Sequence, residues 1–274
     1  MDNRQVIKPV QKHPLRRALG KEYYILRRKL RWMRHASRYV QRPGGGDTLP
    51  GFHTVAEHRS MMLRPLRDVD MRLQYNKVTN LRLAIANING AVIGPGQRLS
   101  IWKLVGRPSK RKGYLEGLAI HNGRIGTGTG GGLCQLGNLL YWMALHTDLD
   151  ITERWRHSFD VFPDVNRTIP FACGATLGYN YLDLEITNNT QDAYRIALWQ
   201  DDGYLHGRIE CSRQPCCTFE VYETDHAIVP QWWGGYTRHN RIWKRRTDMR
   251  DGSSDDILVA ENHAIMMYNP LLPG

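Results

Sequence analysis

The sequence predicts an α+β fold in which buried helices pack on a mainly antiparallel sheet, preceded by a basic N-terminal helical arm. Apolar residues recur at helical spacing after Asn76 and again after Cys134, which predicts two buried helices. From Ala175 to Tyr222, short segments rich in β-branched and aromatic residues alternate with turn residues. That alternation is typical of antiparallel hairpins.

The arm, residues 12–42, has the pattern of an amphipathic helix, with lysines and arginines between regularly spaced apolar residues. The apolar positions are Leu15, Leu19, Tyr23, Leu26, Leu30 and Met33. Two interpretations are open. The helix either packs on its own domain with its basic face in solvent, or lies on an anionic membrane surface or an acidic partner.

The net charge of +12 comes almost wholly from this arm. Residues 1–42 contain 13 lysines and arginines against Asp2 and Glu22, whereas residues 43–274 contain 25 against 24 acidic residues. The remainder of the chain is therefore nearly neutral. It also lacks zinc-finger, helix-turn-helix and RNA-recognition signatures, so nucleic acid is the least favoured partner.

Residues 43–57 are rich in Gly and Pro and are interpreted as a linker. The first buried helix is predicted to begin near Asn76 and to end at Gly90, the position of a helix C-terminal glycine. Two short strands, residues 91–93 and 98–102, are predicted on either side of a Gly-Pro-Gly turn, and a third at residues 118–120.

The second half is predicted to consist mostly of strands, beginning with an extended segment at residues 151–161. Further strands are expected at residues 175–181, 182–187, 194–199, 204–211 and 219–222. The tail from Gln231 shows no clear periodicity, and its segment DGSSDD is predicted to be a mobile loop. We expect a main domain at 58–225 and a C-terminal extension at 226–274.

The five cysteines are an odd number without paired CxxC spacing, and the histidines show no HExxH or HxH spacing. We therefore expect no metal and no cofactor. The N-terminus has no signal-type apolar run, and no window has 18 consecutive apolar residues. The expected location is the cytoplasm, with the arm allowing a peripheral position at the inner face of the membrane.

The segment GTGTGGGLCQLGNLLY, residues 126–141, places a Gly-rich loop directly before a predicted helix. Cys134 falls in the first turn of that helix, where unpaired amides and the helix dipole favour a thiolate. The alternative is a buried cysteine that serves as a small apolar side chain. Gly126, Gly128 and Gly131 also satisfy GxGxxG, but no acidic residue follows at the spacing of a dinucleotide site.

The chain resembles the VanW family, found among accessory genes of some vancomycin-resistance clusters. The resemblance runs from His58 to Arg208 and rests on NKVTNLRLA, INGAVIGPGQRLS, GGGLCQLGNLLYW, ERWRHSFDVFPD and ACGATLGYNYLDLEITNNT, in this order. It implies that residues 58–225 are a VanW-like domain and links the chain to peptidoglycan precursors. Family membership alone assigns no reaction.

The predicted catalytic residues are Cys134 as nucleophile, His157 as its base and Asp183 as the group that orients the imidazole. Asp160 is the alternative to Asp183, but on a strand it would point away from His157. The predicted substrate-binding residues are Gly130, Gly131, Gly132 and Gln135, whose amides or side chain could hold an oxyanion.

Two functions follow from these residues. One is an acyl transfer, or an amide or ester hydrolysis, on a cell-envelope precursor through a Cys134 thioester. The other is non-catalytic binding of a small anionic envelope intermediate by the Gly-rich loop, with Cys134 merely packed. Access to the sulfur and its distance from His157 distinguish them.

Overall fold

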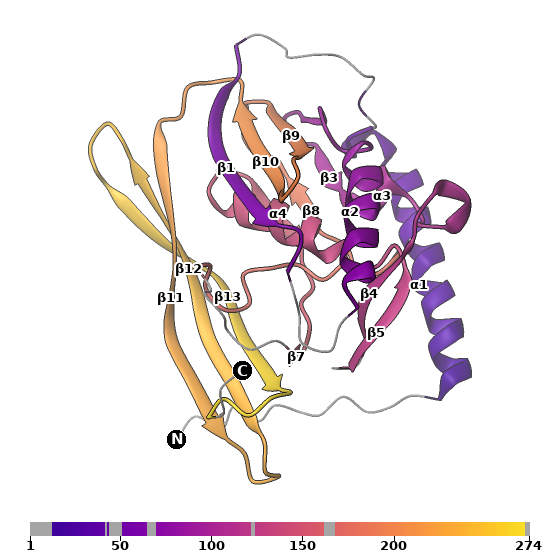
Figure 1. Ribbon diagram of the computed structural model, residues 1–274. Helices are drawn as coiled ribbons and strands as arrows, with labels where there is room; N and C mark the ends of the chain where they lie inside the picture. The colour runs from indigo at the N-terminus through magenta and orange to yellow at the C-terminus, as the bar shows by residue number, and fades with distance from the viewer. Residues whose placement is uncertain are drawn as a thin grey trace.

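The structure is a computed structural model that describes residues 13–41, 43, 51–64, 70–121, 124–161 and 168–271. Of the predicted linker, residues 43–57, the segment 44–50 lies outside these ranges, and residues 53–57 form the start of strand β1. The chain forms a helical and sheet-containing body with three long C-terminal strands on one side and the N-terminal helix on the other (Figure 1).

The helices among the described residues are α1 (Pro14–Arg34), α2 (Met71–Ile85), α3 (Ile101–Val105) and α4 (Cys134–Leu145), with 3-10 turns at Ala36–Arg38 and Lys110–Lys112. α2 begins earlier than its apolar pattern predicted because the Asp70 side chain accepts a hydrogen bond from the Arg72 amide and caps the helix. The predicted strand at 98–102 ends at Ser100, which caps α3 by accepting from the Lys103 amide.

The described strands are β1 (His53–Met61), β2 (Val92–Ile93), β3 (Arg98–Ser100), β4 (Glu116–His121), β5 (Arg124–Thr129), β6 (Asp150–Glu153), β7 (Phe159–Asp160), β8 (Glu185–Thr187), β9 (Tyr194–Gln200), β10 (Tyr204–Cys211), β11 (Cys217–Pro230), β12 (Tyr236–Asp248) and β13 (Ser254–Met266). They form sheets in the orders β1-β10-β9-β2, β11-β12-β13-β7, β3-β8-β6 and β4-β5. Strand pairing is antiparallel except for β7, which runs parallel to β13.

The core lies where α4 packs against β1 and β10. Leu136, Leu140 and Met143 of α4 are fully or almost fully buried, as are Ile196 and Ile209 of the facing sheet. Gly207 on β10 leaves room for this packing, because a Cβ there would lie 2.5 Å from the Met143 methyl group. This close packing fixes α4, and with it the first turn of the helix, against the sheet.

The predicted α+β class with mainly antiparallel sheets is confirmed. Other local predictions also differ. Gly126 and Gly128 belong to β5 rather than to a loop, and residues 175–181 form no regular strand. The tail from Gln231, predicted without regular structure, supplies β12 and β13, and DGSSDD forms their turn and the start of β13. β12 pairs with β11, which extends across residue 225, and β13 pairs with β12 and β7. This pairing between strands stabilises the tail.

Candidate functional site

The loop before α4 takes a conformation that its glycines make possible. Gly130 and Gly132 have φ angles of +77° and +91°, a region that side chains with a Cβ rarely occupy. Gly131 is required for a different reason, lack of space. A Cβ there would lie 2.2 Å from the backbone carbonyl of Gly117. The loop therefore packs directly against the backbone at the start of β4.

Helix α2 holds the other side of this loop through NKVTN, residues 76–80. Asn80 is fully buried, and its side-chain amide donates to the carbonyls of Leu115 and Gly131 while its carbonyl accepts from the Leu115 amide. Asn76 donates to the Glu116 carbonyl at 2.8 Å. The two family-like motifs NKVTNLRLA and GGGLCQ thus form one structural unit.

The thiol of Cys134 is engaged with the backbone of Leu177. Its sulfur accepts from the Leu177 amide at 3.4 Å and donates to the Leu177 carbonyl at 3.7 Å. Burial of the thiol raises its pKa, which outweighs the favourable contact with the Leu177 amide. Although the residue as a whole is only partly buried, the thiol is predominantly protonated at neutral pH.

The residues after Cys134 also anchor α4. The Gln135 side-chain amide donates to Ser60 Oγ at 2.9 Å and to the Met61 carbonyl at 2.9 Å. Asn138 accepts a hydrogen bond from the Ala175 amide at 2.8 Å. The amide donor of Gln135, predicted to hold an oxyanion, is thus engaged with the end of β1 in this conformation.

Lys77 is a cationic residue beside the same loop, and sequence analysis did not single it out. Its stem passes over Gly132, because a Cβ on Gly132 would lie 2.3 Å from Lys77 Cγ. Its ammonium group donates to Gln74 Oε1 at 2.8 Å. Burial and repulsion by Arg64 lower the pKa of Lys77 to about 8.

The first turn of α4 adds unpaired donors to this positive region. The N-cap residue Leu133 provides no side-chain acceptor, and no acidic residue lies in the first turn. Within the described residues, the Gly132 and Leu133 amides make no hydrogen bond of acceptable geometry. Helix N-terminal amides of this kind attract anions.

His157 lies in the segment that leads into β7, next to β13. Its carbonyl accepts a hydrogen bond from Arg156 at 3.2 Å. In the part of the chain that the structure describes, the hydrogen bonds of the Cys134 thiol go to Leu177 rather than to the His157 ring. A catalytic role for His157 stays a prediction.

Asp183 is fully buried near the N-terminus of α3, where it accepts hydrogen bonds from the Ser100 hydroxyl at 2.5 Å and the Trp102 amide at 3.2 Å. Burial raises its pKa to about 7, against the opposing effects of Ser100 and Arg28. Asp160, the alternative orienting group, accepts instead from the Tyr268 hydroxyl at 2.9 Å and faces Arg238.

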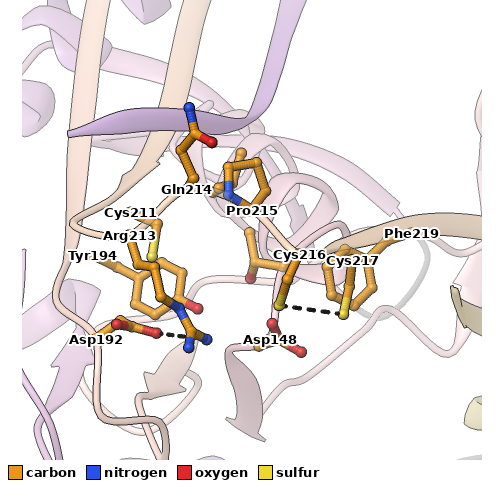
Figure 2. A pocket seen from close by; sticks show the side chains of 12 residues that line it. Asp148, Asp192, Tyr194, Cys211, Arg213, Gln214, Pro215, Cys216, Cys217 and Phe219 are labelled. Atoms are coloured by element: carbon orange, nitrogen blue, oxygen red, sulfur yellow. Dashed lines mark hydrogen bonds and ion pairs between the residues drawn. The ribbon is translucent and has the colours of Figure 1, made fainter. Parts of the chain in front are cut away.

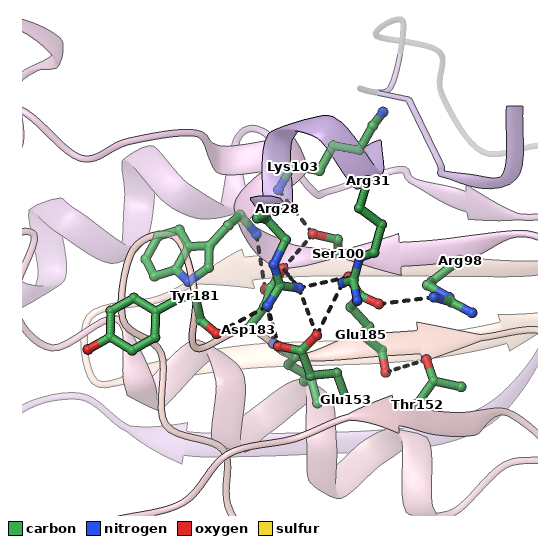
Figure 3. A network of polar contacts seen from close by, with 12 residues as sticks. Arg28, Arg31, Arg98, Ser100, Lys103, Thr152, Glu153, Tyr181, Asp183 and Glu185 are labelled. Carbon is green, nitrogen blue, oxygen red and sulfur yellow. Dashed lines mark hydrogen bonds and ion pairs between the residues drawn. The ribbon is translucent and has the colours of Figure 1, made fainter. Parts of the chain in front are cut away.

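Asp183 belongs to a buried charge cluster that joins α1 to the domain (Figure 3). Arg28 of α1 lies 2.5 Å from a Glu153 oxygen and 3.0 Å from a Glu185 oxygen. Arg31 pairs with the same two carboxylates. Burial opposes ionisation of Glu153, but hydrogen bonds from Arg28 hold its pKa below the ordinary value.

The sequence profile described as VanW like protein matches residues 76–210, which contain both the Cys134 loop and Asp183. The chain is 38% identical over 202 residues to the vancomycin B-type resistance protein VanW of Enterococcus faecalis, covering 74% of this chain and 73% of that relative. The chain belongs to the VanW family.

A second match is shorter. The uncharacterized protein YoaR of Bacillus subtilis is 30% identical over 82 residues, which cover 30% of this chain and 27% of YoaR. No solved structure matches the chain. Among the described residues, no helix is long and apolar enough to cross a membrane.

A small cavity lies elsewhere in this VanW-family chain, between β9, β10 and the start of β11 (Figure 2). Its volume is about 30 Å³, room for water but not for a substrate. Cys216 and Cys217 line it with their sulfurs 3.7 Å apart. Burial and the Cys216 contact raise the pKa of Cys217 to about 11, and the described residues contain no group of three side chains able to ligate a metal.

Proposed function

We propose that this VanW-family chain binds an anionic group of a cell-envelope precursor at the loop of residues 130–133 and the first turn of α4. The proposal rests on the positive charge there, which no acidic group among the described residues offsets. Lys77 lies against Gly132 and is repelled by Arg64. The Gly132 and Leu133 amides add unpaired donors in the described structure.

A bound carboxylate or phosphate would compensate both the unpaired amides and the repulsion between the two cations. It would accept hydrogen bonds from the loop amides, and it would offset the repulsion between Lys77 and Arg64. The choice of envelope precursors as the ligand class rests on vancomycin resistance in the name of the Enterococcus faecalis relative. Cys134 has a structural role in this proposal, because its thiol bonds to Leu177 in both directions.

Calorimetric titration tests the proposal with two probes, inorganic phosphate and D-alanyl-D-alanine, whose carboxylate occurs at the end of peptidoglycan stem peptides. The Lys77→Met variant keeps most of the stem but removes the charge, and it should lose at least about tenfold in affinity. Lys110→Met changes an exposed lysine on a nearby turn and should bind as the wild type does.

The pH dependence provides a second readout. Because the free Lys77 has a pKa of about 8, affinity should fall as the pH rises through that value. Equal affinity of the wild type and Lys77→Met for both probes would overturn the proposal.

Covalent catalysis by Cys134 is a second candidate, and its place in the first turn of α4, directly after the loop amides in the chain, favours it. Those amides could hold the oxyanion of a tetrahedral intermediate. His157 would then accept the thiol proton as predicted, and Asp183 would require a rearrangement away from Ser100 to orient the imidazole. Cys134→Ala separates the candidates, since it preserves ligand binding in both but abolishes thioester formation in this one, as intact-mass spectrometry would detect.

A further inference from the structure

Helix α1 exposes the apolar side chains that an amphipathic helix normally buries. The stripe consists of Leu15, Leu19, Tyr23, Leu26, Leu30 and Met33, each between 52% and 69% exposed. These residues recur at steps of three or four and therefore share one face of the helix. A continuous apolar stripe of this length on a protein surface marks an interaction site.

The opposite face of α1 attaches the helix to the domain. Ile25 and Arg28 are buried there, and Trp32 packs against the core. Arg28 reaches down from the helix into the carboxylates of Glu153 and Glu185 (Figure 3). Rolling the helix to bury its leucines would withdraw Arg28 from both carboxylates. Glu185 would keep one arginine of the domain, but the Glu153 carboxylate would lose its cation, so the contact keeps the stripe facing outward.

Exposed cations border the stripe. By the helical repeat, Arg16, Arg27 and Arg34 follow one edge, and Lys29 follows the other beside the acidic residue Glu22. Two copies joined stripe to stripe would bring these like charges together, which disfavours a second copy as the occupant. An anionic lipid surface satisfies both features, because it accepts apolar side chains below its headgroups and attracts the arginines and lysine at their level.

We propose that α1 lies on an anionic membrane surface with this stripe inserted. The ion pairs of Arg28 with Glu153 and Glu185 then couple the helix to the VanW domain. The helix is too polar to span a bilayer, and it has the basic borders and apolar face of interfacial helices. The domain would thereby be held in one orientation at the membrane.

Vesicle co-sedimentation of the full chain tests this. The wild type should pellet at low salt with vesicles of phosphatidylglycerol and phosphatidylcholine, and binding should weaken with added salt and with pure phosphatidylcholine. Leu19→Asp and Leu26→Asp should each lower partitioning by at least about tenfold, through loss of apolar insertion and addition of a repelled charge. Arg27→Gln should lower it about fivefold.

Met249→Asp is the matched control. Met249 is 61% exposed, comparable to Leu19 at 69%, but lies in the turn between β12 and β13. It should pellet as the wild type does. Circular dichroism and thermal melting establish that each variant is folded, which is expected because the substituted side chains are exposed.

Three results would overturn the proposal. The first is wild-type protein that stays in the supernatant with anionic vesicles at low salt. The second is equal pelleting of Leu19→Asp and Met249→Asp. The third is a concentration-dependent dimer, detected by sedimentation velocity, that Leu19→Asp abolishes while vesicle binding is unchanged, which would assign the stripe to a second copy.

Discussion

Gly131 and Gly117 touch backbone to backbone, so a Cβ on Gly131 would lie 2.2 Å from the Gly117 carbonyl carbon. This contact joins the loop before α4 to the start of β4. It explains why the segment tolerates no side chain at this position, although the φ of Gly131 is not in the left-handed region.

Gly131→Ala should therefore destabilise the protein by about 2 to 3 kcal/mol, because the overlap involves backbone atoms that cannot move aside easily. Urea unfolding measures the change. Gly126→Ala is the control, since the nearest atom to its added Cβ, the Ala119 carbonyl oxygen, is 3.9 Å away. A Gly131→Ala variant as stable as Gly126→Ala would show that the hairpin and loop can separate.

The Cys134 thiol should react slowly with iodoacetamide at neutral pH. Burial raises its pKa above that of a free thiol, and each unit lowers the thiolate fraction about tenfold. Mass spectrometry of the peptide that contains Cys134 gives the rate, and the same peptide alkylated in denaturant is the control. Faster alkylation in the native state would instead favour the nucleophilic function.

The Asp183 carboxyl should make stability fall with rising pH. Its folded-state pKa of about 7 is above the unfolded value, so the stabilisation is fully present below the unfolded pKa and is lost as the pH rises through 7. Between pH 5 and pH 8 the loss is about 2 to 3 kcal/mol.

Asp183→Asn should remove this slope while retaining acceptance from the Trp102 amide. Urea unfolding at several pH values measures the pH dependence of the free energy of unfolding. Asp202→Asn, on the exposed β9–β10 turn, is the control for loss of a carboxylate elsewhere. Parallel pH profiles for the wild type and Asp183→Asn would exclude Asp183 as the titrating group.

Arg28→Ala should release α1 from the domain, because it leaves Glu153 and Glu185 with incomplete pairing; the expected cost is about 3 to 5 kcal/mol. Limited proteolysis should then cleave within α1 much faster. Arg27→Ala changes the adjacent, exposed arginine and should leave the cleavage rate unchanged. Equal rates in the two variants would mean that Arg28 does not hold the helix.

Local sequence signals determined much of this fold. The apolar spacing in α4 predicted its buried face, and the alternation in β9 and β10 predicted a hairpin. The glycines before Cys134 predicted a loop there, and Gly130 and Gly132 take positive φ angles in it. These features depend on neighbours along the chain, and periodicity and glycine chemistry record them directly.

The tertiary structure decided which groups meet. Apolar spacing identified the stripe of α1 but not its outward direction, because that direction depends on Glu153 and Glu185, more than 100 residues away. In the same way, Lys77 reaches the Cys134 loop only because α2 packs beside it. Whether a cation is paired, and whether a thiol is ionised, depends on burial and on distant charges, and no local pattern in the sequence contains that information.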